Sequence, residues 1–112
     1  IMATMNTLQA ASWKGKMTKE NILKTLRLLR PELATRYKVQ EIGLFGSFVR
    51  GEQADTSDID VLVEFNQDAS FFDLVRLSLF LEEKFQRKVD VIPKESLRAE
   101  IRETVLRERV LV

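Results

Sequence analysis

Apolar residues near the start of the chain follow helical spacing. From Thr18, whose hydroxyl can cap a helix, apolar side chains recur every three or four residues as far as Leu29. Proline suits the first turn of a helix and disrupts a helix interior, so Pro31 either kinks this helix or begins a second one over Pro31–Tyr37. The pattern therefore predicts one kinked helix or two consecutive helices.

Three later segments have the composition of β-strands. Val39–Phe45, Asp58–Phe65 and Lys88–Ile92 are rich in β-branched and aromatic residues, and Pro93 ends the third. Between the first two strands, Ser47–Gly51 is predicted to form a short helix or a turn. The pattern thus predicts strands on both sides of a glycine-containing turn.

Two amphipathic helices are predicted in the second half of the chain. Ser70–Gln86 carries Phe71, Phe85 and several leucines at helical intervals, and we expect these aromatic rings in the core rather than stacked on a ligand. Glu95–Arg109 mixes apolar residues with Arg and Glu at helical spacing. This second pattern predicts a helix with a solvated, charged face.

The length and composition limit the classes of protein to consider. A chain of 112 residues has room for one small domain with a single hydrophobic core. The absence of cysteine and histidine excludes disulfides, thiolate metal sites and Ser-His-Asp or Cys-His nucleophiles, and argues against zinc chemistry. A chain without disulfides is expected in the cytoplasm, and no stretch resembles a membrane span or a signal peptide. Residues 1–16 show no clear amphipathic period and are interpreted as an extension or a cloning remnant preceding a domain over residues 17–112.

Charge is unevenly distributed along the chain although the net charge is only +1. Residues 1–30 carry six basic and one acidic side chain, residues 31–90 carry seven and twelve, and residues 91–112 carry five and four. An acidic centre is compatible with metal binding. It argues against a long basic groove for duplex nucleic acid.

A Gly-Ser turn followed by two carboxylates is the strongest candidate for chemistry. Gly46 and Ser47 directly follow a predicted strand, so the backbone can approach a phosphate and the serine can offer a hydroxyl and an N–H to it. Asp58 and Asp60 lie two residues apart in strand-like sequence, so both carboxylates leave the same face. Such a pair is repulsive without a cation between them, and all-oxygen ligation suits Mg²⁺. The plainer interpretation, a surface turn and a solvated strand end, is disfavoured by the joint occurrence of both parts at this spacing.

A third carboxylate, Asp90, lies between two valines in the third predicted strand. If this strand lies beside Asp58–Phe65, Asp90 joins Asp58 and Asp60 on one face. The alternative is an ion pair between Asp90 and a nearby basic residue such as Lys88. Around two metal ions, the paired carboxylates would hold the ions and the nucleotide phosphates, Asp90 would complete the site that carries the attacking hydroxyl, and the Gly-Ser turn would grip the leaving pyrophosphate.

The turn and the paired-carboxylate strand together resemble a known family. Residues 46–52, Gly-Ser-Phe-Val-Arg-Gly-Glu, and 56–65, Thr-Ser-Asp-Ile-Asp-Val-Leu-Val-Glu-Phe, are similar to the minimal nucleotidyltransferases (MNT proteins) of the DNA polymerase beta superfamily. The resemblance runs from about Met17 to the end of the chain. Val49 departs from the pattern, because family members often have a smaller residue there, and we expect it to be tolerated. The resemblance implies an α/β fold with a short mixed β-sheet flanked by helices.

The resemblance also implies roles for individual residues. Arg50 matches the family's Arg-Gly pair and either binds the nucleotide phosphates or forms a structural salt bridge to Glu52 or Asp55. Two Mg²⁺ ions are the implied cofactors. The remaining roles are phosphate binding for Gly46 and Ser47, and catalysis with metal ligation for Asp58, Asp60 and Asp90.

An activity and a partner follow from the same resemblance. Many members are antitoxins that neutralise a HEPN-domain ribonuclease toxin by transferring AMP from ATP to a toxin tyrosine. We therefore expect a Mg²⁺-dependent protein adenylyltransferase with ATP as substrate and a HEPN toxin as partner, and with neither a membrane nor a stable nucleic-acid complex. The helical faces Phe71–Phe85 and Leu97–Leu111 are candidate surfaces for a homo-oligomer or for the toxin.

Three other functions agree less well with the sequence. A non-catalytic antitoxin that acts by binding alone is the main alternative, although pure binding gives no reason for paired carboxylates. Nucleotide transfer to a small molecule such as an aminoglycoside usually needs an additional acceptor-binding domain, for which the chain lacks room. Nucleotide addition to nucleic-acid ends is disfavoured by the acidic middle of the chain.

Overall fold

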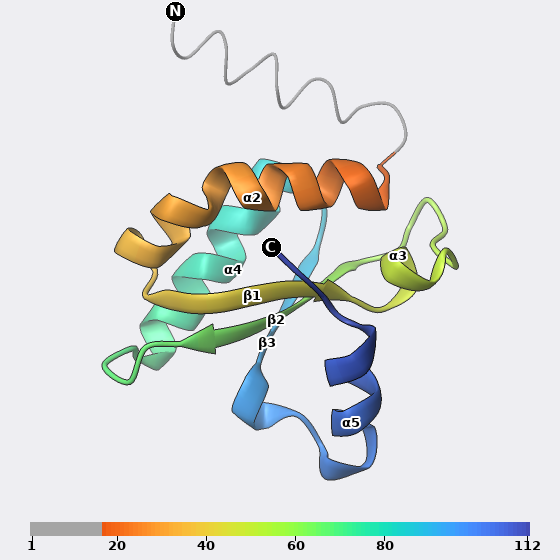
Figure 1. Ribbon diagram of the computed structural model, residues 1–112. Helices are drawn as coiled ribbons and strands as arrows, with labels where there is room; N and C mark the ends of the chain where they lie inside the picture. Colours follow the sequence, from red (N-terminus) through yellow and green to blue (C-terminus); the bar gives the residue numbers. More distant parts are fainter. Residues whose placement is uncertain (1–16) are drawn as a thin grey trace, which may run out of the picture.

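Helices and strands alternate through the part of the chain that the structure, a computed structural model, describes: residues 17–112. The interpretation of residues 1–16 as an extension lies outside the described residues. The elements, shown in Figure 1, are α2 (Lys19–Arg36), β1 (Val39–Phe45), α3 (Ser47–Arg50), β2 (Ile59–Phe65), α4 (Phe71–Phe85), β3 (Val89–Pro93), the 3₁₀ helix η2 (Lys94–Ser96), α5 (Ala99–Glu108) and β4 (Val110–Leu111). None of these helices is long and apolar enough to cross a membrane.

The strands form one mixed sheet in the order β3-β2-β1-β4. β1 is antiparallel to both of its neighbours, β2 and β4, whereas β2 and β3 are parallel and are joined through α4. A parallel pair needs such a crossover because its strands cannot be connected by a tight turn. The expected fold class, a short mixed sheet flanked by helices, is therefore confirmed.

The two faces of the sheet are covered by different helices. Helices α2 and α4 lie on one side and α5 lies on the other (Figure 1). Alternate residues of β2 separate accordingly, since Ile59, Val61 and Val63 belong to the larger core with α2 and α4, whereas Leu62 belongs to a smaller cluster with Leu97 and Val105. Even-numbered residues of β2, including Asp60, therefore face the side of α5.

Helix α2 is continuous through Pro31. The Thr18 hydroxyl accepts a hydrogen bond from the Asn21 N–H at 3.1 Å, as expected for a cap. Pro31 cannot bond the carbonyl of Arg27, but both residues are exposed and water can replace the lost partner. Leu33 is buried beyond the proline, so packing on the sheet keeps one helix instead of two.

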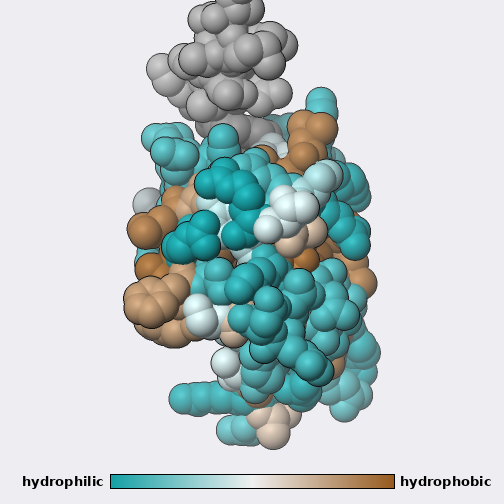
Figure 2. Space-filling view, turned by 90° about the vertical axis from the view of Figure 1, so that its left-hand side faces the viewer, coloured by the Kyte–Doolittle hydropathy of each residue, from teal (hydrophilic) through white to brown (hydrophobic). Residues whose placement is uncertain are grey.

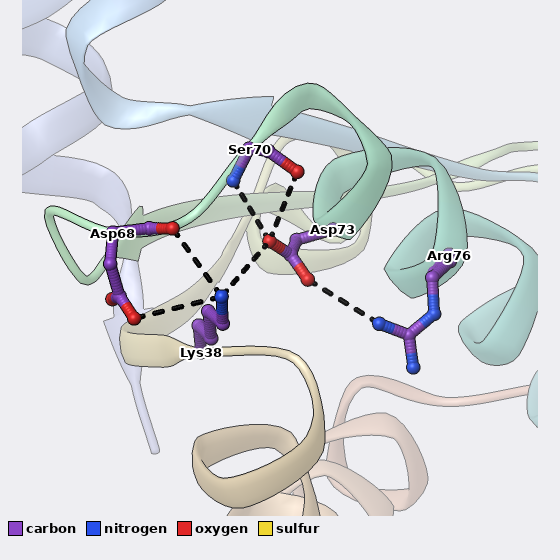
Figure 3. Close-up of polar contacts among 5 residues, drawn as sticks. All are labelled: Lys38, Asp68, Ser70, Asp73 and Arg76. Atoms are coloured by element: carbon purple, nitrogen blue, oxygen red, sulfur yellow. Dashed lines mark hydrogen bonds and ion pairs between the residues drawn. The ribbon is translucent and has the colours of Figure 1, made fainter.

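A polar network fixes the start of α4 (Figure 3). Ser70 and Asp73 form a capping box, in which the Ser70 N–H donates to the Asp73 carboxylate at 2.8 Å. The ammonium of Lys38 lies 3.8 Å from Asp73 and 3.6 Å from Asp68, and Arg76 pairs with Asp73 at 3.4 Å. The Ser70 backbone hydrogen bond, followed by the charge of Lys38, keeps the pKa of the buried Asp73 below its usual value. These contacts tie α4 to the connection between α2 and β1.

The expectation that Phe71 lies in the core is wrong. Its side chain is 72% exposed, whereas Phe85 at the other end of α4 is 1% exposed. In the first turn the inward position is taken by Asp73, so Phe71 lies at the margin of the helix face that packs on the sheet. Figure 2 shows hydrophobic atoms gathered at the left edge of the face in view, on the side where α4 covers the sheet. The exposed apolar side chains of α4 are Phe71, Phe72, Val75 and Leu79.

Other boundaries differ slightly from the predictions. The third strand includes Pro93, and the helix predicted over Glu95–Arg109 is divided into η2 and α5. The two-residue strand β4 was not predicted. It pairs Val110 with Leu44 and Leu111 with Gly43, and so attaches the end of α5 to β1.

Candidate functional site

Two of the predicted carboxylates lie side by side at the start of the parallel strand pair. Asp60 of β2 is paired in register with Asp90 of β3, and on its other side Asp60 is paired with Phe45, the last residue of β1. Neighbouring residues in register project from the same face of a sheet. Asp58 lies two residues before Asp60, directly ahead of β2. The structure thus brings Asp60 and Asp90 together on one face of the sheet, and the charge of Asp58 acts on Asp60 from the residues just before β2.

Crowding of these carboxylates changes the protonation of Asp60. Burial, followed by the negative charges of Asp90 and Asp58, raises the pKa of Asp60 from 3.8 to about 6, and the guanidinium of Arg50 opposes the rise. An acid that is half-buried among other acids favours its neutral form because ionisation adds like charge to a partly desolvated site. A cation bound beside these carboxylates would therefore be stabilised by their negative charge.

A lysine supplies part of that positive charge. The Lys88 ammonium lies 2.9 Å from Asp90 Oδ1, so the ion pair considered as an alternative role for Asp90 is present. The hydrogen bond to Asp90 is the main cause that raises the pKa of Lys88. Because the Lys88 side chain is 63% exposed, the pair is screened by water and contributes little to stability. Lys88 can consequently leave Asp90 at low cost when another cation binds there.

The Gly-Ser turn lies directly against Asp60. Gly46 follows β1 with φ 84° and ψ −154°, a conformation that favours glycine. A Cβ atom at this position would lie 2.3 Å from Asp60 Oδ2, so any larger residue would collide with the carboxylate. Ser47 begins the one-turn helix α3 immediately afterwards. The structure thus brings the predicted phosphate-binding turn into contact with Asp60, one of the predicted metal-binding carboxylates.

Arg50, at the end of α3, forms ion pairs with two glutamates. Its Nε lies 2.8 Å from Glu52 Oε1, which agrees with the predicted structural salt bridge, and its Nη1 lies 3.1 Å from Glu108 Oε2. The hydrogen bonds to Glu52 and then Glu108 raise the pKa of Arg50. Since Arg50 also affects the pKa of Asp60, its charge reaches the carboxylate cluster. Arg50 is thus both a partner in structural ion pairs and a source of positive charge beside the carboxylates.

Glu108 is a member of this site that the sequence did not indicate. Besides pairing with Arg50, its Oε1 accepts a hydrogen bond from the Gly46 N–H at 2.7 Å. In the sequence Glu108 is one of several Glu residues alternating with Arg, which is typical of a solvated helix face. A pairing of β4 with β1 would have been the signal, but a two-residue strand has no detectable periodicity.

The sequence of residues 26–112 matches the family model of the nucleotidyltransferase domain. The chain belongs to this family. This nucleotidyltransferase is 43% identical over 96 residues to the protein adenylyltransferase MntA of Thermococcus cleftensis, a match that covers 86% of this chain and 97% of that protein.

Solved structures agree with that membership. One, which carries a provisional assignment as a minimal nucleotidyltransferase, has a TM-score of 0.73 and 34% identity over 86% of this chain and 97% of its own. Another is a chain of a toxin–antitoxin complex with AMP-PNP, which has a TM-score of 0.62 and 27% identity and is matched over 79% of this chain and 68% of that chain. The nucleotidyltransferase fold and the arrangement of its sheet are therefore shared with proteins solved by experiment.

The donor atoms of this nucleotidyltransferase fit a hard metal ion. Among residues 17–112, no three acidic side chains are arranged to hold one metal ion together. The paired carboxylates of Asp60 and Asp90 nevertheless provide only oxygen donors, and the pKa of Asp60 is raised, first by burial and then by the neighbouring carboxylates, in spite of the positive charge of Arg50. Mg²⁺ commonly uses one or two carboxylates and completes its shell with water and substrate phosphates. The residues present are compatible with that mode of binding.

Proposed function

We propose that this nucleotidyltransferase is a Mg²⁺-dependent protein adenylyltransferase, which transfers AMP from ATP to a tyrosine of a HEPN ribonuclease toxin in the cytoplasm and thereby acts as an antitoxin. The observation that carries the proposal is the in-register pair of Asp60 and Asp90 beside the Gly46 turn. Support for adenylyl transfer comes from the similarity to a protein adenylyltransferase. Support for the nucleotide and the partner comes from the similarity to a chain of a toxin–antitoxin complex with AMP-PNP.

The reaction forms one bond and breaks another at the α-phosphate of ATP. The acceptor oxygen bonds to the α-phosphorus, pyrophosphate leaves with the electrons of the broken P–O bond, and the acceptor hydroxyl gives its proton to water or to the carboxylate of Asp90. Bound Mg²⁺ would supply charge neutralisation on the phosphates and a lower pKa for the attacking hydroxyl. Catalysis of this kind depends mainly on position and charge, which a short chain can provide.

Each part of the site has a role in this proposal. Asp58 and Asp60 would hold the metal ion with the nucleotide, and Asp90 would complete the site for the acceptor hydroxyl. The backbone at Gly46 and the hydroxyl of Ser47 bind the pyrophosphate that leaves. Arg50 directs positive charge toward the same phosphates, since its field already reaches Asp60.

Intact-mass measurement of the toxin tests the proposal. The purified protein is incubated with Mg²⁺, ATP and its cognate toxin, and we expect the toxin to gain mass in AMP units. The double variant Asp58→Ala/Asp60→Ala should abolish the gain while keeping its fold, as judged by circular dichroism. A double variant with undiminished transfer would disprove the assignment of these carboxylates to catalysis.

Asp68→Ala is a matched control for this experiment. Asp68 is an exposed aspartate that follows the far end of β2 and pairs with Lys38 instead of the site. The same chemical change at this position should leave transfer intact. Peptide mapping of the modified toxin then tests whether the acceptor is a tyrosine, and omission of Mg²⁺ tests the metal requirement.

A second candidate, neutralisation by binding alone, is favoured by the exposed apolar side chains of α4. Phe71 and Phe72 are 72% and 76% exposed, and such residues are common in the buried centre of protein interfaces. Toxin protection in cells distinguishes the two functions. If Asp58→Ala/Asp60→Ala still protects cells as well as the wild type does, binding suffices and catalysis is not the basis of neutralisation.

A further inference from the structure

The Glu108 carboxylate bridges two parts of the phosphate-binding turn. Its Oε1 accepts the Gly46 N–H at 2.7 Å, and Arg50 Nη1 lies 3.2 Å from Oε1 and 3.1 Å from Oε2. The Glu108 side chain is only 16% exposed, whereas the Glu103 side chain on the same helix is 84% exposed. A charge-assisted hydrogen bond to a backbone N–H is stronger than a neutral one, and it is stronger still where water is partly excluded.

The chain after Glu108 is attached to β1, which fixes the position of this carboxylate. Arg109 pairs with Glu41 of β1 at 3.0 Å, and β4 then continues along the same strand. Gly43 permits this close approach, because a Cβ atom there would lie 3.1 Å from Leu111 Cδ2 and 3.3 Å from the Val110 carbonyl oxygen. The end of α5 is therefore held against the strand that leads into the turn.

Gly46 is consequently enclosed by two acidic residues. Asp60 lies against its Cα, where no Cβ could fit, and Glu108 holds its N–H. One of these carboxylates belongs to the proposed metal site, whereas the other points to the turn from α5. With both contacts in place, the peptide before Gly46 has a defined orientation.

We infer that Glu108 is a positioning residue, which holds the Gly46–Arg50 turn in the conformation that receives the nucleotide phosphates. The inference rests on the proposed function for the identity of the ligand. Without Glu108, the Gly46 peptide loses its acceptor, and within residues 17–112 Arg50 retains only Glu52 as its ion-pair partner. The turn then has to be ordered by the nucleotide itself, which weakens binding.

Nucleotide affinity in Glu108 variants is the first test. With Mg²⁺ and AMP-PNP, Glu108→Ala should raise the dissociation constant about tenfold, the effect expected for one charge-assisted hydrogen bond. Glu108→Gln retains an oxygen for the Gly46 N–H but loses the charge opposite Arg50, so it should give an intermediate value. In the transfer assay the change should appear in KM for ATP while kcat stays within about threefold of the wild type.

Glu103→Gln is the matched control, because it removes the same charge from α5 at an exposed position that pairs only with Arg107 among the described residues. It should leave affinity unchanged. Unchanged affinity in Glu108→Ala would overturn the inference. Tighter binding would also overturn it, since Glu108 would then be occupying the place of a phosphate.

Hydrogen exchange of the Gly46 amide provides a test without nucleotide. This N–H should exchange slowly in the wild type and in Glu103→Gln, and at least tenfold faster in Glu108→Ala at a temperature where the variant remains folded. Fast exchange in the wild type would overturn the inference. If the wild type binds AMP-PNP but transfers no AMP, the proposed function fails while the Glu108 variants still decide the positioning role.

Discussion

Asp60 and Asp90 are paired in register across the parallel strands β2 and β3, so two carboxylates project from adjacent points on one face of the sheet. Partial burial of Asp60, followed by repulsion from Asp90 and Asp58, raises its pKa to about 6. Replacing one of the paired carboxylates by a side chain that is always neutral should therefore remove this repulsion and stabilise the folded, metal-free protein.

The pH dependence of stability follows from the raised pKa of Asp60. The folded state binds the proton more tightly than the unfolded chain, whose carboxyl has a pKa near 3.8, so stability is lost as pH rises from about 4 to about 6. Asp60→Asn should increase the free energy of unfolding by about 1 kcal/mol at pH 7.5, since solvent screens a half-buried group, and should have little effect near pH 4. Urea denaturation in the presence of a chelator measures this difference. A destabilised variant at pH 7.5 would contradict the prediction, and Asp68→Asn serves as the exposed control.

Lys88 and a metal ion compete for the same carboxylate. Because the Lys88 ammonium lies 2.9 Å from Asp90 Oδ1, Lys88→Ala should lower the dissociation constant for Mg²⁺ about threefold. Titration calorimetry gives the constant directly. Lys94→Ala is the control, because it removes a lysine that pairs at 3.6 Å with Glu64 of β2 instead of with Asp90. It should leave the dissociation constant for Mg²⁺ unchanged. Weaker Mg²⁺ binding in Lys88→Ala would instead mean that Lys88 orients Asp90.

Much of this site could be predicted because its signals are local. Side chains alternate along a strand, so Asp60 lies on the face opposite to Ile59 and Val61. In the third strand, Asp90 likewise lies on the face opposite to its neighbouring valines. The first predicted strand, Val39–Phe45, coincides with β1 in both bounds. Only the assumption that the second and third strands are neighbours was needed to bring the two carboxylates together.

Glu108 could not be predicted because its role depends on contacts between distant parts of the chain. Its partner Gly46 is 62 residues away, and the attachment depends on the two-residue strand β4. The exposure of Phe71 has a similar origin. Its spacing suggests the core face of α4, but the capping box turns Asp73 inward in that first turn.

The two ends of α4 should respond differently to the loss of an aromatic ring. Phe85 is 1% exposed and belongs to the main core, so Phe85→Ala should lower the free energy of unfolding by about 3–5 kcal/mol. Phe71 is 72% exposed, so Phe71→Ala should change it by less than about 0.5 kcal/mol. Urea denaturation of both variants gives the comparison. Equal losses would show that Phe71 packs in the core after all.

Two glycines with positive φ differ in ψ, −154° at Gly46 and 24° at Gly51, and in what surrounds them. Gly46 and Gly51 have φ of 84° and 73°, but a Cβ atom at Gly46 would meet Asp60 Oδ2 at 2.3 Å, whereas one at Gly51 would meet nothing within 4 Å. Gly51→Ala should therefore cost only the strain of the left-handed conformation, about 1 kcal/mol, and keep nucleotidyl transfer within about twofold. Gly46→Ala adds the larger strain of a backbone conformation that is restricted to glycine, and it displaces a carboxylate assigned to the metal site, so transfer should fall by about a hundredfold or more.

Rates and denaturation curves for both glycine variants distinguish these effects. If the two variants lose the same stability and the same activity, backbone strain alone explains the glycine at position 46 and its contact with Asp60 has no catalytic importance. If Gly46→Ala loses activity well beyond its loss of stability, the turn and the carboxylate act as one unit. That outcome would connect the phosphate-binding and metal-binding halves of the site through a single van der Waals contact.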